Sequence, residues 1–431
     1  MKIKYDRFEL ANGLRVLVHE DASTPMVVVN VLYDVGARDE DPKKTGFAHL
    51  FEHLMFGGSV HIEDFETPLQ LAGGENNAYT TNDFTNYYIQ LPAENIETAF
   101  WLESDRMLSL AFDEKSLDVQ RKVVMEEFKE HYINKPYGDV WFKMRELVYK
   151  QHPYRWMTIG SELSHIEQAQ LEDVKRFFFK YYRPVNAILV VAGKTTAAQV
   201  RELAEKWFGD IPAGEKYIRR LPQEPKQQEA RKMTVKADVP LDALYKCYPM
   251  AARTEPGYYV ADLLTEVLGG SASSRLHQSL IKEKKLFSQL ECYHTGSNDP
   301  GLVVIEGKLI KGVSMEVADA AVEEELDKLK AAAISEKELT KVKNKTESAI
   351  VFEDMSVMNR ANSLAIYELL GDVNMMNTEL DKYRAVTAAE MLETSRRIFD
   401  PLNSNTLYYR AVEGTGGTFE AGEGSDPKGG Q

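Results

Sequence analysis

The sequence predicts an α+β fold made of two homologous α/β-sandwich halves, each a mixed β-sheet with helices. Three observations lead to this prediction. The chain has 431 residues, more than one hydrophobic core usually supports. Strand-like and helical spacings of apolar residues are mixed along the first 210 residues. After a polar stretch that carries two prolines, the pattern starts again.

We expect the domain boundaries to follow this polar stretch. It runs over 219–232 and is predicted to be a linker. The first domain is then 1–218 and the second 233–413. The last segment, 414–431, is rich in glycine and acidic residues, which predicts a disordered tail.

The first half shows its elements in order. β-branched runs bounded by Gly, Asp and Pro indicate two strands that pair with each other, at 13–21 and 26–36. Next, 45–58 has apolar residues three and four apart and ends in two glycines, which predicts a helix. Further along we expect a strand-like stretch at 76–92, helices at about 94–110 and 114–134, and a buried strand at 186–193.

An internal duplication relates the two halves. The stretch 257–276 can be laid over 45–61 so that the paired apolar residues and the paired glycines coincide, with one residue deleted. In this alignment, three polar residues of the first copy are replaced: His49 by Asp262, Glu52 by Thr265 and His53 by Glu266. We therefore expect the second copy to lack the chemistry of the first.

Composition and charge exclude several classes of protein. The formal net charge of −15 argues against nucleic-acid binding, which needs clustered Lys and Arg. An acidic surface either attracts basic or unfolded peptides or serves solubility alone. The sequence contains no run of 18 uncharged apolar residues, so it predicts no membrane span. Its first residues lack the apolar region of a signal peptide. We therefore expect a cytoplasmic location.

The segment "HLFEHLM" predicts a metal site. His49 and His53 are four residues apart and share one face of a helix, so both imidazoles can hold one Zn²⁺. Glu52 lies beside them and is free to act as a general base. The arrangement H-x-x-E-H is the inverse of the H-E-x-x-H zinc-peptidase motif. The alternative is a helix whose two histidines form hydrogen bonds in the core.

A third protein ligand is expected on the helix at 114–134. Its apolar stripe contains Leu117, Val123, Val124 and Phe128. Glu127 lies three and four residues after two of these valines, so we expect it to face inward and to be the third ligand. Two other carboxylates, Glu126 and Glu130, share the outer face with lysines.

These motifs resemble the pitrilysin family of zinc peptidases, which includes insulin-degrading enzymes and mitochondrial processing peptidases. The resemblance covers nearly the whole chain and is closest to the processing-peptidase-like bacterial branch. It rests on "VGARDEDPKKTGFAHLFEHLMFGGS", "GGENNAYTTNDFTNYY", "QRKVVMEE", "YYRPVNAILVVAG" and "LGGSASSRLHQSL". It implies a zinc-dependent endopeptidase that cuts peptides or unfolded segments inside a chamber of four such halves, with one Zn²⁺ per metal-binding chain.

The resemblance also implies a peptide-binding strand beside the metal. The strand carries Asn76, Asn77, Ala78 and Tyr79 and would add the substrate as a further strand. The alternative is an edge strand blunted by polar residues. In relatives, a Glu seven residues before the third ligand supports the metal site without binding the metal itself. Here Gln120 occupies that position and brings no charge.

One departure from the family concerns partners. Active single-chain relatives carry an Arg and a Tyr in their second half, and here Ile281 and Ser288 occupy those positions. We therefore expect a heterodimer in which a paralogous chain supplies the pair; a homodimer and a degenerate site are the alternatives. Outside peptidases, the competing functions are a non-catalytic scaffold, like the core proteins of respiratory complexes, and a peptide-holding chaperone.

Overall fold

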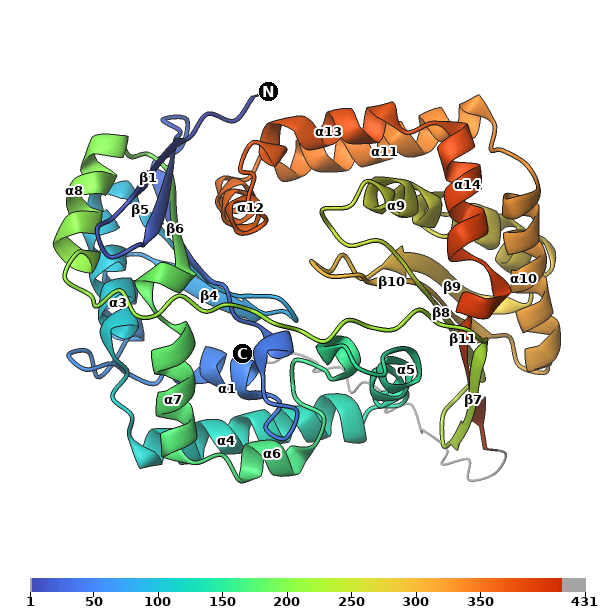
Figure 1. Ribbon diagram of the computed structural model, residues 1–431, viewed down its shortest axis with the longest axis horizontal. Helices are drawn as coiled ribbons and strands as arrows, with labels where there is room; N and C mark the ends of the chain where they lie inside the picture. Colours follow the sequence, from blue (N-terminus) through green and yellow to red (C-terminus); the bar gives the residue numbers. More distant parts are fainter. Residues whose placement is uncertain (1, 413–431) are drawn as a thin grey trace, which may run out of the picture.

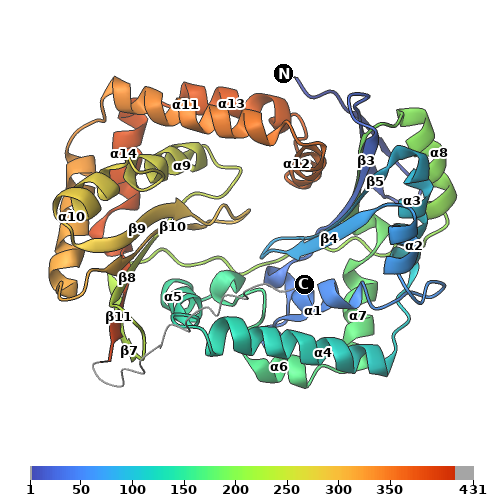
Figure 2. The ribbon, with the colours of Figure 1, turned by 180° about the vertical axis from the view of Figure 1, so that it is seen from behind.

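Two mixed β-sheets, one in each half, organise the chain (Figure 1). The computed structural model describes residues 2–412, and the tail predicted at 414–431 lies outside the described residues. Seen from either side, the two halves lie next to each other around a central opening in the ribbon (Figures 1 and 2). An α+β fold with two mixed-sheet halves, as predicted, is confirmed.

The first sheet has the strand order β1-β2-β6-β3-β5-β4. Its strands are β1 (Asp6–Glu9), β2 (Arg15–Glu20), β3 (Met26–Tyr33), β4 (Glu75–Thr80), β5 (Thr85–Pro92) and β6 (Ala187–Gly193). The prediction that β2 and β3 pair with each other was wrong, because β6 lies between them, parallel to β2 and antiparallel to β3. Every residue of β6 is buried, which suits a central strand covered on both faces.

The helices of this half include those predicted at 45–58, about 94–110 and 114–134, which correspond to α1, α3 and α4. They are α1 (Phe47–Leu54), α2 (Glu66–Leu71), α3 (Ile96–Leu108), α4 (Glu114–Phe128), α5 (Val140–Val148), α6 (Leu163–Glu167), α7 (Leu171–Tyr181) and α8 (Ala197–Phe208). Helix α1 contacts β4 on one side and α4 on another. This packing places the predicted ligands of α1 and α4 on neighbouring helices.

The second sheet repeats the first. Its order is β7-β11-β8-β10-β9, which corresponds to β2-β6-β3-β5-β4, and each neighbouring pair keeps the same parallel or antiparallel relation. The strands are β7 (Arg231–Ala237), β8 (Ala243–Pro249), β9 (Phe287–His294), β10 (Leu302–Leu309) and β11 (Asn405–Ala411). The helices are α9 (Gly257–Leu268), α10 (Met315–Ala331), α11 (Glu336–Glu353), α12 (Val357–Leu369), α13 (Met375–Ala385) and α14 (Ala388–Ile398). Helix α9 follows β8 as α1 follows β3.

The two halves exchange helices across the boundary between them. Helix α5 packs Val140 and Met144 against buried residues of the second sheet, such as Cys247. In return, Leu364 of α12 packs in one buried cluster with Val190 of the first sheet. Figures 1 and 2 show α12 beside the first sheet. Each half therefore completes the hydrophobic cover of the other.

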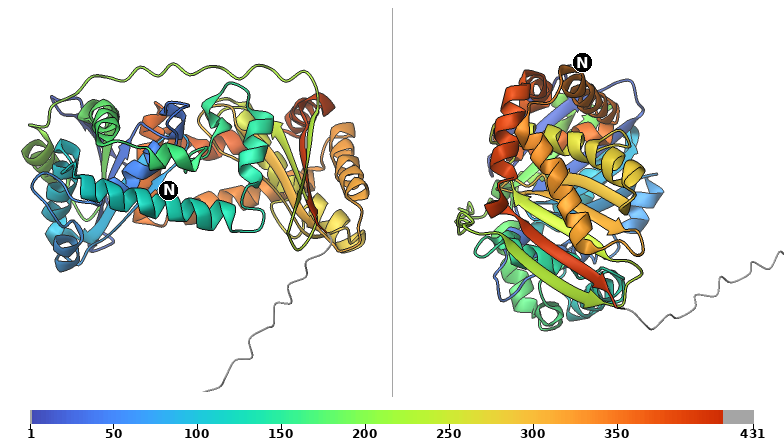
Figure 3. Two further views of the ribbon diagram at one scale, coloured as in Figure 1. Left: turned by 90° about the horizontal axis from the view of Figure 1, so that it is seen from below. Right: turned by 90° about the vertical axis from the view of Figure 1, so that its right-hand side faces the viewer.

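The connection between the halves is longer than the predicted linker of 219–232. No helix or strand lies between α8 and β7, and the last two residues of the predicted linker already belong to β7. Figure 3 shows this segment running extended along one side of the molecule. Arg219 bonds Asp34 and Asp39 of the first half, and Arg231 donates to the carbonyl of Val148. Specific contacts thus fasten the segment along its length.

Among residues 2–412, no helix combines the length and the apolar composition that a membrane crossing requires.

Candidate metal centre

Glu40 fixes the start of helix α1 through hydrogen bonds to its first turn. The carboxylate of Glu40 accepts the backbone N–H of Gly46 (2.9 Å) and of Ala48 (2.8 Å). Gly46 has a φ of +87°, a conformation that favours glycine. Five apolar residues of α1 are buried: Phe47, Ala48, Leu50, Phe51 and Leu54. The polar residues of the helix therefore turn away from the core.

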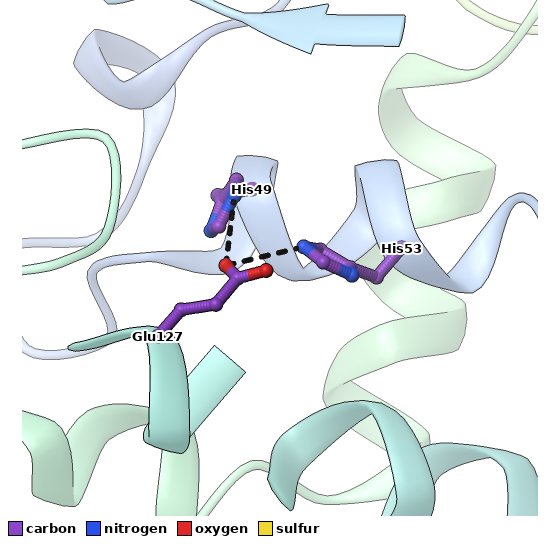
Figure 4. Close-up of side chains that lie close together, drawn as sticks. All are labelled: His49, His53 and Glu127. Carbon is purple, nitrogen blue, oxygen red and sulfur yellow. Dashed lines mark ion pairs between the residues drawn. The ribbon is translucent and has the colours of Figure 1, made fainter. Parts of the chain in front are cut away.

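His49 and His53 of α1 and Glu127 of α4 meet at one point (Figure 4). The Nε2 atom of His49 lies 3.7 Å from Oε2 of Glu127, and the Nε2 atom of His53 lies 3.5 Å from the same oxygen. The two imidazole rings are nearly perpendicular, with centroids 4.8 Å apart. One possible ligand atom from each residue lies within 4.8 Å of the other two.

The donor set and its spacing suit a divalent metal ion. Two imidazole nitrogens and one carboxylate oxygen are ligands that Zn²⁺ takes in catalytic sites, at about 2.0–2.2 Å each. Two such ligands on a tetrahedral ion are about 3.3 Å apart. The two nitrogen–oxygen distances here are close to that value and longer than ordinary hydrogen bonds. The residues present therefore fit the ion that the motif implies.

Burial keeps one of the imidazoles neutral. Burial, with a smaller contribution from His53, lowers the pKa of His49 to about 4. A histidine must be neutral to bind a metal. Because of its lowered pKa, His49 is already neutral at pH 7 and would release no proton on binding the ion. The Nδ1 atom of His49 is buried and has no hydrogen-bond partner among the described residues. The Nε2 atom is the one directed at Glu127.

Glu52 lies on the same helix but outside the group of three. Its Oε2 atom accepts a hydrogen bond of 2.6 Å from the hydroxyl of Thr80, the last residue of β4. Burial is the main cause that raises the pKa of Glu52, and the bond from Thr80 acts in the opposite direction. The site thus contains a carboxylate that is near the three converging residues without joining them. Thr80 was missed at the sequence level, although it lies two residues after Ala78 and therefore on the same strand face.

Strand β4 is the edge of the first sheet and, among the strands of residues 2–412, pairs with β5 alone. The four residues predicted to bind substrate lie on it but do not share one face. Ala78 packs with the core on the α1 side, whereas Tyr79 packs with the cluster that contains α12. Asn76 donates to Glu66, and the Asn77 side chain accepts the N–H of its neighbour. What the four share is the backbone edge.

Two expectations about α4 need comment. The prediction that Val123 belongs to the apolar stripe was wrong: its side chain is 39% exposed, while Leu117, Val124 and Phe128 are buried. Val123 lies four residues before Glu127 and so faces the same open side. Among the described residues, no hydrogen bond joins Gln120 to His49, His53 or Glu127, so its assisting role stays a prediction.

At the two positions where relatives carry an Arg and a Tyr, this chain has neither residue. Ile281 packs partly buried against the second core. Ser288 of β9 donates its hydroxyl to the carbonyl of Lys308. Neither side chain carries a positive charge or a phenol.

With this geometry established, comparison with known sequences identifies the family. Residues 15–151 match the profile of insulinase, peptidase family M16, and residues 168–346 match that of the peptidase M16 inactive domain. The chain belongs to the M16 peptidase family. It is similar to the zinc protease PqqE of Helicobacter pylori, with 29% identity over 413 residues, 94% of this chain and 93% of PqqE. It is also 25% identical to the uncharacterized zinc protease YmxG of Bacillus subtilis, over 91% of this chain and 95% of YmxG.

Solved structures extend the likeness to the fold. A protease from Helicobacter pylori superposes with a TM-score of 0.90 at 29% identity, over 95% of this chain and all of that one. The periplasmic protease PqqL of Escherichia coli superposes with a TM-score of 0.79 at 17% identity, over 96% of this chain. This match covers only 48% of PqqL. At such low identity the second likeness shows the fold alone.

Proposed function

We propose that the chain is the zinc-binding, catalytic subunit of a metalloendopeptidase that hydrolyses peptides or unfolded polypeptide segments. The observation that carries this proposal is the convergence of His49, His53 and Glu127 on one point, with the carboxylate of Glu52 held beside it. The names of the relatives, zinc proteases with matches over more than 90% of this chain, support the same reaction class.

The residues divide the work as follows. His49, His53 and Glu127 would hold Zn²⁺, which when bound supplies a Lewis acid for peptide hydrolysis. Glu52 accepts a proton from the attacking water while oxygen bonds to the peptide carbonyl carbon. Glu52 then gives this proton to the amine nitrogen as the C–N bond breaks. The free backbone edge of β4 would hold the substrate as an additional strand.

We further propose that a second chain completes the chamber. This chain covers 48% of PqqL, so a second chain of similar size would give an assembly of about the length of that longer structure. Because Ile281 and Ser288 offer neither a cation nor a phenol, a paralogous partner that brings Arg and Tyr is favoured over a homodimer. The cytoplasmic location and the absence of nucleic-acid partners stay predictions from composition.

A peptide cleavage assay tests the function. The purified chain, loaded with Zn²⁺, is mixed with quenched fluorescent peptides, alone and with candidate paralogous chains. We expect cleavage that a chelator abolishes and Zn²⁺ restores, and that E52Q lacks. Peptide binding without cleavage in every mixture would instead support the chaperone, and neither binding nor cleavage would support the scaffold. Equal activity with and without each paralogue would contradict the heterodimer.

A further inference from the structure

Thr80 connects the edge strand β4 to the catalytic carboxylate. It is the last residue of β4 and lies on the same strand face as Ala78, which packs on the α1 side. Its hydroxyl donates to Oε2 of Glu52 over 2.6 Å. Among the described residues, this is the only side-chain hydrogen bond that the Glu52 carboxylate receives. The backbone N–H of Thr80 makes a smaller contribution to the same carboxylate, so Thr80 is the residue that holds Glu52 and its hydroxyl forms the main hydrogen bond.

The position of Glu52 makes this restraint necessary. Glu52 is one residue before His53 and three after His49, so its flexible side chain starts within one helical turn of both imidazoles. Carboxylate oxygens are good ligands for Zn²⁺. A carboxylate released from Thr80 can turn toward the imidazoles and join the ligands, and a base that binds the ion no longer accepts the proton of water.

We propose that Thr80 is a positioning residue: its hydroxyl holds Glu52 as a free base and keeps it out of the metal ligand set. This inference rests on the proposed peptidase function of the same site. It also assigns β4 two tasks, because the strand whose free edge would bind the peptide backbone ends in the residue that aims the base.

Four variants separate positioning from simple structural support. T80V removes the hydroxyl and keeps the shape, T80A removes it without the branched side chain, and T80S keeps it. T85V is the matched control: Thr85 faces Thr80 across the β4–β5 pair, and its hydroxyl donates to the carbonyl of Val35 and not to Glu52. Each protein is measured for kcat, KM, metal content, thermal unfolding and, after Co²⁺ loading, visible absorption. Co²⁺ reports its coordination number through the intensity of this absorption.

We expect T80V and T80A to lose about 10- to 100-fold in kcat with KM and metal content unchanged, the loss that a hydrogen bond to a charged group predicts. We expect T80S to retain most of the wild-type kcat and T85V to retain all of it. The Co²⁺ absorption of T80V should weaken as the coordination number rises, and E52Q/T80V should match E52Q alone. If T80V unfolds, T80A against T80S gives the same comparison.

The outcomes distinguish this inference from the proposed function. If the wild-type protein cleaves peptides and T80V and T80A retain its kcat and its Co²⁺ spectrum, Thr80 does not position Glu52 and the function stands. If the wild-type protein cleaves no peptide in any mixture, the function fails, and the Co²⁺ spectra alone decide whether Thr80 keeps Glu52 off the metal.

Discussion

Helices α1 and α9 occupy equivalent places beside two sheets that share the order of five strands, yet of these two helices only α1 contributes to a group of side chains that could hold a metal ion. In the alignment of the two halves, His49, Glu52 and His53 correspond to Asp262, Thr265 and Glu266. The apolar residues of both helices are buried alike. The two helices therefore share their apolar positions and differ at three polar ones.

The polar residues of α9 are occupied with one another and with their surroundings. Asp262 pairs with His294 (3.1 Å) and accepts a hydrogen bond from the hydroxyl of Tyr383 (2.5 Å). Thr265 donates to the carbonyl of Asp262, and Glu266 pairs with Lys345. At all three equivalent positions, the side chain is therefore bonded to other residues of the second half. By contrast, His49, His53 and Glu127 face one another across distances too long for hydrogen bonds, which leaves room for an ion.

The largest effect should separate the two helices by activity. We expect E52Q to reduce kcat by about 100- to 10,000-fold, because the amide cannot accept the proton of water. The equivalent change in the second half, T265V, should leave kcat unchanged. The measurement is peptide cleavage at saturating substrate with metal content determined in parallel. Wild-type kcat in E52Q with full metal content would show that Glu52 is not the base.

Metal binding should follow the same division. We expect H53A to lower Zn²⁺ affinity by more than about 100-fold. Mutating a residue that hydrogen-bonds to a metal ligand typically lowers metal affinity by about 10- to 100-fold, and removing a ligand itself should cost more. E266Q, at the matching position of α9, should bind one ion per chain as before. Competition with a chromogenic chelator gives both affinities. Equal affinity in H53A and the wild type would contradict the proposed ligand set.

A third comparison tests whether the halves are separable. Leu364 of α12 and Met144 of α5 are each fully buried against the sheet of the other half. We expect L364A and M144A each to lower the free energy of unfolding by about 2–5 kcal/mol. Urea unfolding followed by both fluorescence and circular dichroism should still give one transition. Two transitions would mean that the exchanged helices do not couple the halves.

The smallest expected effect is a pH dependence at the start of α1. Burial raises the pKa of Glu40 to about 8. Its carboxyl group thus binds a proton more tightly in the folded than in the unfolded chain, and the stability it contributes at low pH is lost as pH rises toward 8. We expect E40Q, which does not titrate, to gain up to about 1.4 kcal/mol of stability relative to the wild type from pH 7 to pH 8. A constant difference between the two proteins in urea unfolding would contradict this.

The sequence predicted correctly several features that depend on residue spacing within a single helix. The histidine spacing indicated a shared face of α1, and Glu127 was chosen for its distance to Val123 and Val124 along α4. The structure brings the three residues together, although Val123 and Glu127 lie on a partly open side of α4. Strand order was not predictable in the same way. Placing β6 between β2 and β3 pairs residues 154 to 173 positions apart, and periodicity carries no information about such pairings.

The sequence by itself determined the residue types, the helix faces and the absence of the histidine pair from the second copy, because these depend on local spacing and side-chain chemistry. Tertiary structure alone decided that Thr80 reaches Glu52, that α5 and α12 exchange between the halves, and that Val123 stays exposed. These features arise where surfaces distant in sequence meet. Their energies depend on shape and burial in three dimensions, which no local pattern records.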